Sequence, residues 1–224
     1  MTPRVQIPDA EYGQRVQRAA KLVAEKGLDV LVANSNEADF ANVRYFSGFW
    51  PLFEIGGVAI APSGQAALMV GPESETFAGE RSRISNIHKS LAYRESADPA
   101  YPDVEVSSFS DIFASIGVKA PRRIGVAGYL VTSMPVYEGL RNAFPDAEIV
   151  NADDVMTSLR QIKSEAELAC LKEAFRITQH ALNVVLDRIK PGMTELQVVG
   201  IVQQALYENG AEYEAHPVYV LSGP

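Results

Sequence analysis

The first part of the chain alternates short apolar runs with segments of helical periodicity. Asp29–Asn34 is an apolar run bounded by turn formers, which predicts a buried strand. Residues 57–62 and 66–70 flank Ser63-Gly64 and predict a hairpin. Further strands are predicted near 89–94, 123–127 and 148–150, and helices over 9–26, 74–83, 110–117 and 134–144. This alternation predicts an α/β domain with helices packed on a sheet.

The pattern changes after Asp153, where long helical segments replace short strands. Ser164-Glu-Ala-Glu167 and Thr194-Glu-Leu-Gln197 are capping boxes, so each predicts the start of a helix. Between them an apolar stripe recurs at spacings of three and four, formed by Leu168, Leu171, Phe175, Thr178, Leu182, Val185 and Ile189. Residues 218–221 predict a strand.

The boundary between these two patterns predicts two unequal domains, 1–158 and 159–224. Two helices and a first strand do not close a hydrophobic core by themselves. We therefore expect the second domain to be incomplete within these 224 residues.

Composition and charge narrow the class of function. The net charge of −8 argues against nucleic-acid and anionic-membrane partners, because phosphate binding needs clustered Lys and Arg. The single cysteine, Cys170, excludes an internal disulfide. The N-terminal residues lack the apolar stretch of a signal peptide, and no run approaches the ~18 apolar residues of a membrane span. A cytoplasmic protein is the expectation.

Several motifs resemble the creatinase/prolidase/aminopeptidase P family, and the resemblance covers nearly the whole chain. In order they are Asn42-Val-Arg-Tyr-Phe-Ser-Gly-Phe49, Leu159-Arg-Gln-Ile-Lys-Ser-Glu-Ala-Glu167, Ile189-Lys-Pro-Gly-Met-Thr-Glu195 and the segment from Gly210 to Pro224. The first is similar to the signature of the creatinase-type N-terminal domain, and the second to the entry of the catalytic domain. The third is similar to the turn between the first two helices of that domain, and the fourth to the segment that leads into its active site.

The resemblance implies a ribonuclease-H-like α/β domain with a mixed sheet, followed by the start of an α+β pita-bread domain. Family metallopeptidases hold two divalent metals, often Mn, Co or Zn, between two Asp, one His and two Glu, and a bridging hydroxide attacks the bond before proline. Creatinase hydrolyses a guanidino C–N bond without metal. All these ligand positions, and the catalytic histidine, correspond to positions beyond Pro224, so no catalytic or metal-binding residue is assigned here.

Three residues are candidates for substrate contact. His216 lies in the segment entering the active site, although the position of a substrate-contacting histidine in methionine aminopeptidases is Glu214 here. Trp50 and Phe53 follow the Ser47–Phe49 turn, in a loop that reaches the neighbouring subunit's active site in creatinase and aminopeptidase P. The alternatives are a structural histidine and an aromatic core or interface cluster.

Two pairs of carboxylates in the first domain were considered as metal ligands. Asp29 and Asp39 are ten residues apart, but one precedes a strand and the other lies in a turn or helix signal. Two such carboxylates are not expected to converge on one ion. Asp153 and Asp154 are interpreted as helix-capping residues.

These observations favour the interpretation that the chain is the N-terminal part of an Xaa-Pro aminopeptidase- or prolidase-like metallohydrolase. The full-length parent protein is then expected to be an enzyme, and the 224-residue chain is expected to be inactive alone. The alternatives are part of a creatinase-like metal-free hydrolase, or a non-catalytic peptide- or protein-binding and dimerisation module. A homodimer is expected. The parent's substrate would be a peptide or a small guanidino or amide compound.

Overall fold

The computed structural model describes residues 5–52, 54–98 and 100–223 and divides into two compact units. One unit is Pro8–Ile162, and the other consists of the described residues from Lys163 onward together with residues 5–7. The division falls in the extended Ile162 that ends a helix and precedes the Ser164 capping box.

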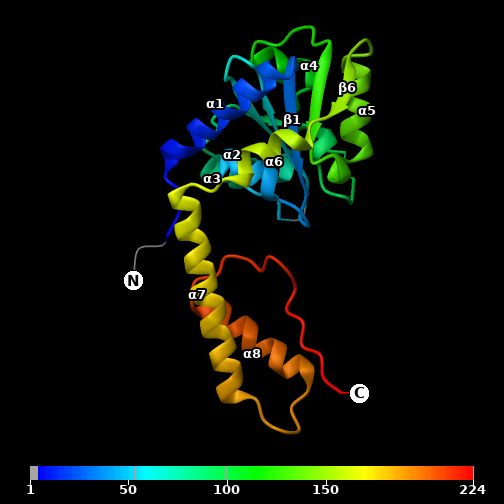
Figure 1. Ribbon diagram of the computed structural model, residues 1–224. Coiled ribbons are helices and arrows are strands. Elements are labelled where there is room, and N and C mark those ends of the chain that lie inside the picture. Colours follow the sequence, from blue (N-terminus) through cyan, green and yellow to red (C-terminus); the bar gives the residue numbers. More distant parts are fainter. Residues whose placement is uncertain (1–4, 53, 99, 224) are drawn as a thin grey trace. The chain divides into compact units, whose positions relative to one another are not determined.

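A six-stranded mixed sheet forms the centre of the first unit (Figure 1). Its strands are β1 (Val30–Ser35), β2 (Gly56–Ile60), β3 (Ala66–Val70), β4 (Ile87–Lys89), β5 (Arg123–Ala127) and β6 (Glu148–Asn151). The order is β4-β3-β2-β1-β5-β6. The pairs β1–β2 and β2–β3 are antiparallel, and the remaining neighbours are parallel. The predicted hairpin and mixed α/β fold are confirmed.

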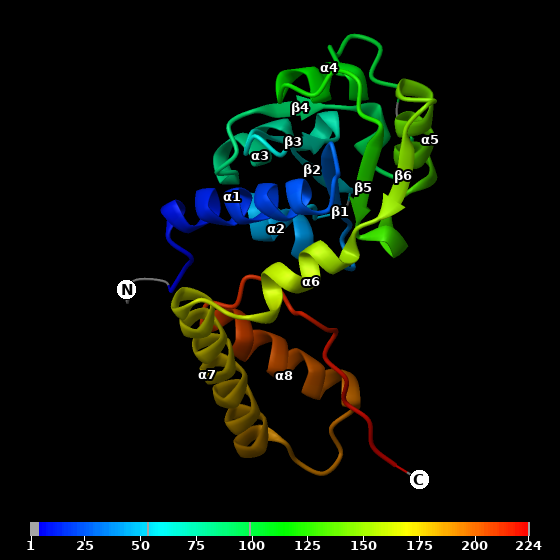
Figure 2. The same ribbon diagram turned by 45° about the horizontal axis from the view of Figure 1, so that its top comes forward.

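Helices cover both faces of this sheet (Figure 2). They are α1 (Asp9–Glu25), α2 (Ala41–Ser47), α3 (Glu75–Arg81), α4 (Phe109–Ser115), α5 (Met134–Ala143) and α6 (Asp153–Gln161). One core packs α1, α2, α3 and α6 against the sheet, and the other packs α4 and α5 against its opposite face. Three short 3₁₀ turns are η1 (Pro72–Ser74), η2 (Leu91–Tyr93) and η3 (Tyr129–Val131).

The central strand β1 belongs to both cores because its side chains alternate between the faces of the sheet. Leu31 and Ala33 enter the core beneath α1 and α2, whereas Val30 and Val32 enter the core beneath α4 and α5. All six residues of β1 are buried. This explains the continuous apolar run in the sequence, which is typical of a strand covered on both sides.

Two local predictions in the first unit are corrected. The strand expected near 89–94 is shorter and lies earlier, at Ile87–Lys89, and the chain then turns into η2. Its parallel partner β3 ends at Val70, which pairs with Lys89, so the ladder has no further partner. Helix α2 was not predicted as a helix, because five of its seven residues are buried and the polar face that reveals helical periodicity is missing.

Polar side chains meet at the carboxyl end of β1, where Asn34 makes three hydrogen bonds. The Tyr93 hydroxyl donates to Asn34 Oδ1 at 2.9 Å, and Asn34 Nδ2 donates to Thr132 Oγ1 at 2.9 Å. Asn42 Nδ2 donates to the Asn34 carbonyl at 3.2 Å. Asn34 and Tyr93 are buried, and burial raises the pKa of the Tyr93 hydroxyl. The network therefore joins β1 to α2, η2 and the segment after η3 with every participating group paired.

The second unit contains α7 (Glu165–Arg188) and α8 (Glu195–Glu208), and both predicted capping boxes are formed. Its described residues contain no strand, so the strand predicted over 218–221 is wrong. A strand requires a neighbour for its backbone hydrogen bonds, and none of the second unit's described residues provides one. Among the described residues, no helix combines the length and hydropathy needed to cross a bilayer.

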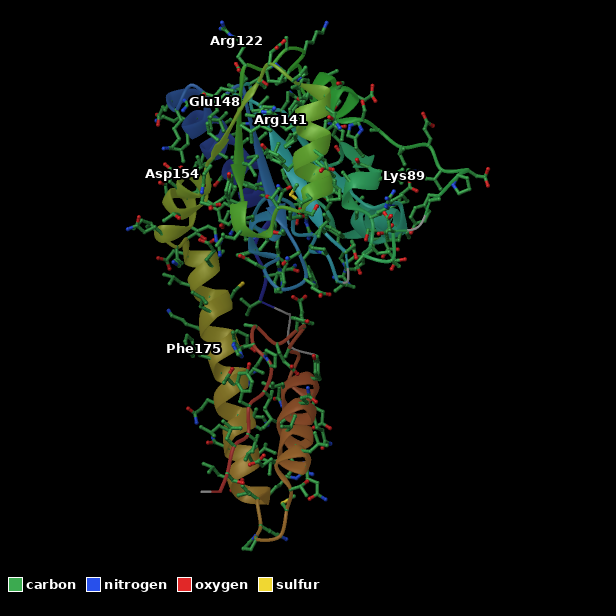
Figure 3. All side chains as sticks on the ribbon, turned by 90° about the vertical axis from the view of Figure 1, so that its right-hand side faces the viewer. Lys89, Arg122, Arg141, Glu148, Asp154 and Phe175 are labelled. Carbon is green, nitrogen blue, oxygen red and sulfur yellow. The ribbon has the colours of Figure 1, made fainter. Side chains whose placement is uncertain are left out.

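The apolar stripe of α7 lies mostly on the exposed side of the helix. The residues that α7 buries are Ile177 and Ala181, and α8 buries Val198, Ile201 and Ala205. By contrast, Phe175 is 75% exposed, and its side chain is labelled on α7 in Figure 3. The exposed apolar residues of the stripe are Leu168, Leu171, Phe175, Leu182 and Ile189. These five residues form the α7 apolar face.

Removing the Asn34 side chain should destabilise the first unit. Asn34→Ala leaves the buried Tyr93 hydroxyl without its acceptor, and we expect a loss of about 1–3 kcal/mol in the free energy of unfolding. Urea denaturation followed by circular dichroism measures it. The control Tyr129→Phe removes an exposed hydroxyl and should change stability by less than about 0.5 kcal/mol. Equal effects of the two variants would contradict the role given to Asn34.

Candidate substrate-contacting residues

The turn after α2 determines where Trp50 lies. Helix α2 ends at Gly48, whose φ of 76° is in the left-handed region that favours glycine. The Ser47 hydroxyl donates to the Val43 carbonyl at 2.7 Å, and its oxygen accepts from the Phe49 amide at 3.1 Å. These bonds close the turn, so that Phe49 and Trp50 fold back into the unit and are buried.

Trp50 is packed among aromatic rings and one cation. Its ring centroid lies 5.9 Å from that of Phe77, edge to face, and 6.5 Å from that of Phe40. The Arg44 guanidinium carbon lies 4.2 Å from the Trp50 ring centroid and 5.9 Å from that of Phe40. Arg44 and Trp50 are six residues apart, and α2 with its terminal turn brings them together. Sequence patterns did not predict the contact between Arg44 and Trp50, and only the place of Arg44 on a short helix before an aromatic cluster could have indicated it.

Trp50 was interpreted either as a substrate-contacting residue or as part of an aromatic cluster, and its environment has features of both. Only 8% of its surface is exposed, as expected of an aromatic cluster. Its indole Nε1 is buried and has no hydrogen-bond partner among the described residues. Close by in sequence, the buried Glu54 accepts a hydrogen bond from the Ser74 hydroxyl. Phe53, the other candidate in this loop, lies outside the described residues.

His216 belongs to the second unit and is exposed. Its Nδ1 lies 3.4 Å from the Pro217 carbonyl, and its ring centroid lies 4.8 Å from that of Tyr219. The segment around it is neither helical nor paired as a strand. Its end is tied to α8 by Glu195, whose Oε1 accepts hydrogen bonds from the Ser222 amide at 2.5 Å and the Ser222 hydroxyl at 2.9 Å. An exposed imidazole is accessible to ligands, and its substrate role stays a prediction.

Glu214 interacts with Tyr207 at the end of α8. The pKa of the Tyr207 hydroxyl is raised by burial, and further by the Glu214 carboxylate, by Tyr213 and by a hydrogen bond to Glu214. One carboxylate oxygen of Glu214, Oε1, is buried and has no hydrogen-bond partner among the described residues.

The acidic residues considered for a metal site have other partners. Asp29 Oδ2 accepts from the backbone amides of Arg122 and Arg123 at 2.7 and 2.9 Å. Asp153 Oδ1 accepts from the amides of Gly128 and Tyr129. Asp39 Oδ1 accepts from the Ala41 amide at the start of α2. Asp29 and Asp39 thus have backbone partners. The prediction that Asp153 caps a helix is wrong, because the N-cap of α6 is Ala152 and the Asp153 carboxylate instead binds the amides after β5.

No three His, Cys, Asp or Glu side chains come together as a metal site in the part of the chain that the structure describes. These described donors therefore offer no set of ligands for two metal ions.

Replacing Arg44 should uncover one face of the only tryptophan. We expect Arg44→Ala to increase acrylamide quenching of Trp50 fluorescence and to lower the free energy of unfolding by about 0.5–2 kcal/mol, the range of cation–π contacts. Arg81→Ala, which removes a guanidinium 5.5 Å from the Phe77 centroid, is the matched control and should leave the quenching unchanged. Unchanged quenching in Arg44→Ala would show that the aromatic rings shield Trp50 without it.

Comparisons with known proteins agree with the two-unit architecture. The family model of the Creatinase/Prolidase N-terminal domain matches residues 15–162, and that of metallopeptidase family M24 matches residues 169–224. An Xaa-Pro dipeptidase of Pyrococcus furiosus is 28% identical over 212 residues, covering 94% of this chain and 53% of the relative. The uncharacterized peptidase YqhT of Bacillus subtilis is 25% identical, covering 93% of this chain and 53% of the relative.

Solved structures share the fold. The prolidase from Pyrococcus horikoshii OT3 matches with a TM-score of 0.67 and 22% identity, over 89% of this chain and 50% of that protein. The prolidase from Pyrococcus furiosus matches with a TM-score of 0.66 and 24% identity, over 88% of this chain and 54% of that protein. The chain spans about half the length of the curated relatives it matches. It belongs to the creatinase/prolidase family, with a creatinase-type N-terminal domain followed by part of an M24 metallopeptidase domain.

Proposed function

We propose that this chain is the N-terminal part of an Xaa-Pro dipeptidase- or aminopeptidase-like metallohydrolase and does not itself carry the catalytic residues. The observation that carries the proposal is the match of nearly the whole chain to only half of Xaa-Pro dipeptidases. The lack of a gathered metal-ligand set among the described residues is compatible with it. Chemistry would then belong to residues that follow Pro224 in the parent protein.

The domain assignment follows from the same proposal. Residues 1–158 would be the creatinase-type domain, and residues 159–224 would open a pita-bread catalytic domain with α7 and α8. The α7 apolar face supports this, because a contiguous row of exposed large apolar side chains marks a surface that another part of a protein covers. We propose that the remainder of the catalytic domain packs there.

The substrate-contacting roles remain part of the proposal. In the parent protein, Trp50 and Phe53 would line an apolar wall of a substrate site in a homodimer, and His216 would lie at the entry to the active site. Two divalent ions, Mn, Co or Zn, would supply water activation and carbonyl polarisation when bound by the later residues. The first unit would limit which substrates reach them.

The homodimer and the cytoplasmic location are proposed with the function. The first unit exposes Tyr129, Leu130, Met134 and Tyr137 within nine residues, and Leu130 is 97% exposed. Aromatic residues and Met are enriched at the centres of protein interfaces, which supports contact with a second copy. Sedimentation equilibrium of the parent protein would give its mass in solution.

A second candidate function is a non-catalytic binding and dimerisation module, which the α7 apolar face also favours. It differs from the first in what happens to a bound peptide. A module binds proline-containing peptides and leaves them intact, whereas the metallohydrolase cleaves them. A creatinase-like enzyme would cleave a guanidino C–N bond and be insensitive to chelators.

The parent protein, expressed from a gene that extends beyond codon 224, should hydrolyse Xaa-Pro dipeptides. We expect activity with added Mn, Co or Zn, loss of activity in EDTA, and no activity from the 224-residue chain under either condition. The release of free proline measures the hydrolysis of the dipeptide. Activity on creatine that resists EDTA would overturn the metallopeptidase in favour of creatinase-like chemistry, and peptide binding without release of product would favour the binding module.

The effect of Phe175→Ala on stability tests whether the rest of the catalytic domain covers the α7 apolar face in the parent protein. In the 224-residue chain, Phe175→Ala should change the free energy of unfolding by less than about 0.5 kcal/mol, because the ring is 75% exposed. In the parent protein the same change should cost about 3–5 kcal/mol, as for a buried phenylalanine. Denaturant unfolding of both lengths measures this difference.

The control for this comparison is Gln179→Ala, on the same helix and exposed. It should have a small effect at both lengths. A small effect of Phe175→Ala in the parent protein would contradict the proposed packing of the catalytic domain on α7.

A further inference from the structure

The last turn of α6 has no glycine cap. The last four carbonyls of an α-helix lack partners within the helix, and a glycine turn after the helix often supplies amide donors for them. The residue after α6 is instead Ile162, whose φ of −99° and ψ of 116° are extended. The carbonyls of this turn therefore take their donors from water or from side chains of other elements.

Two side chains of α2 hold this turn. The Tyr45 hydroxyl donates to the Leu159 carbonyl at 3.1 Å, and Asn42 Oδ1 accepts from Arg160 Nη1 at 3.3 Å. Asn42 and Tyr45 are both buried and are three residues apart, so they lie on one face of α2. The Asn42–Tyr45 pair thus binds two consecutive residues in the last turn of α6.

Tyr45 also binds α1. Arg15 Nη1 donates to the Tyr45 carbonyl at 2.9 Å, and Arg18 Nη2 donates to the Tyr45 hydroxyl at 3.0 Å. The guanidinium carbon of the buried Arg15 lies 4.3 Å from the centroid of the Tyr45 ring. Helices α1, α2 and α6, which pack on the same face of the sheet (Figure 2), are therefore joined at one tyrosine.

The chain passes between the two units at two places, and each is next to a helix that Tyr45 binds. One is Ile7–Pro8, directly before α1, and the other is Ile162–Lys163, directly after α6. Both residues of the second crossing are exposed. Beyond them, the Ser164 capping box fixes the start of α7. Two exposed residues therefore separate a helix end that is bound by α2 from a helix start that is capped.

We propose that the Asn42–Tyr45 pair confines the hinge between the two units, at this crossing, to Ile162 and Lys163. A hinge is a short stretch that absorbs changes in φ and ψ while the elements on either side stay rigid. With the pair in place, α6 keeps its helical geometry up to its end. Without it, the last turn of α6 frays and the flexible stretch becomes longer.

Hydrogen exchange of the 224-residue chain tests whether the pair holds α6. Tyr45→Phe together with Arg160→Ala removes both bonds to α6 and keeps an aromatic ring at position 45. We expect the amides of 159–161 to exchange about 2- to 10-fold faster in this double variant, as for the loss of one hydrogen bond. The matched control is Tyr137→Phe together with Arg141→Ala, both exposed on α5, which should leave these rates unchanged.

The distribution of distances between two spin labels tests the hinge. Labels at Glu80→Cys on α3 and Lys172→Cys on α7, in a Cys170→Ser background, place one label on each unit. The double variant should broaden this distribution, and the control pair should not. A loss of stability alone leaves the width unchanged, because the molecules that contribute to the distribution remain folded.

Lys163→Gly tests the position of the hinge. Glycine adds backbone freedom at the joint itself, so this variant should broaden the distance distribution while the amides of 159–161 keep their wild-type exchange rates. An unchanged width in Lys163→Gly would overturn the proposal. So would wild-type exchange rates or an unchanged width in the double variant that lacks both bonds to α6. These outcomes do not depend on the proposed hydrolase function.

Discussion

The burial of β1 on both faces is the constraint on which the first unit depends. A strand in this position contributes apolar side chains to two cores at once, at about 1.5–3 kcal/mol for each large side chain removed from water. It also leaves no solvent for polar groups at its end. Asn34 and Ser35 therefore require partners in the protein, and Tyr93, Thr132 and Val43 supply them.

These bonds position the loop that carries Trp50. The Ser35 hydroxyl accepts from the Val43 amide at 3.0 Å, and the Asn34 carbonyl accepts from Asn42 at 3.2 Å, so the end of β1 is joined directly to α2. Helix α2 then presents Arg44 to Trp50 through the Gly48 turn. A buried strand thus determines, through hydrogen bonds and one short helix, where a candidate substrate residue lies.

Sequence patterns predicted those elements whose signal is local. Both capping boxes of the second unit formed because their hydrogen bonds join residues three apart. The hairpin of β2 and β3 formed around Ser63-Gly64 for the same reason. Helix α2 was not predicted, because most of its residues are buried and it lacks the polar face that reveals helical periodicity. The contact between Arg44 and Trp50 was not predicted either, because it depends on a turn that hydrophobic periodicity does not describe. The strand expected over 218–221 failed because pairing depends on a distant partner.

Within α7, the residues that show helical spacing in the sequence differ from the residues that the helix buries. Its spacing of three and four indicated a helix correctly, yet the residues that α7 buries against its own unit are Ile177 and Ala181, outside that stripe. Helix α7 has its cap, its packing against α8 and side-chain bonds along the helix such as Arg176–Glu173, while the large side chains of its apolar face stay exposed. These exposed side chains add to the match with only half of the Xaa-Pro dipeptidases as a reason to regard the second unit as one part of a larger domain.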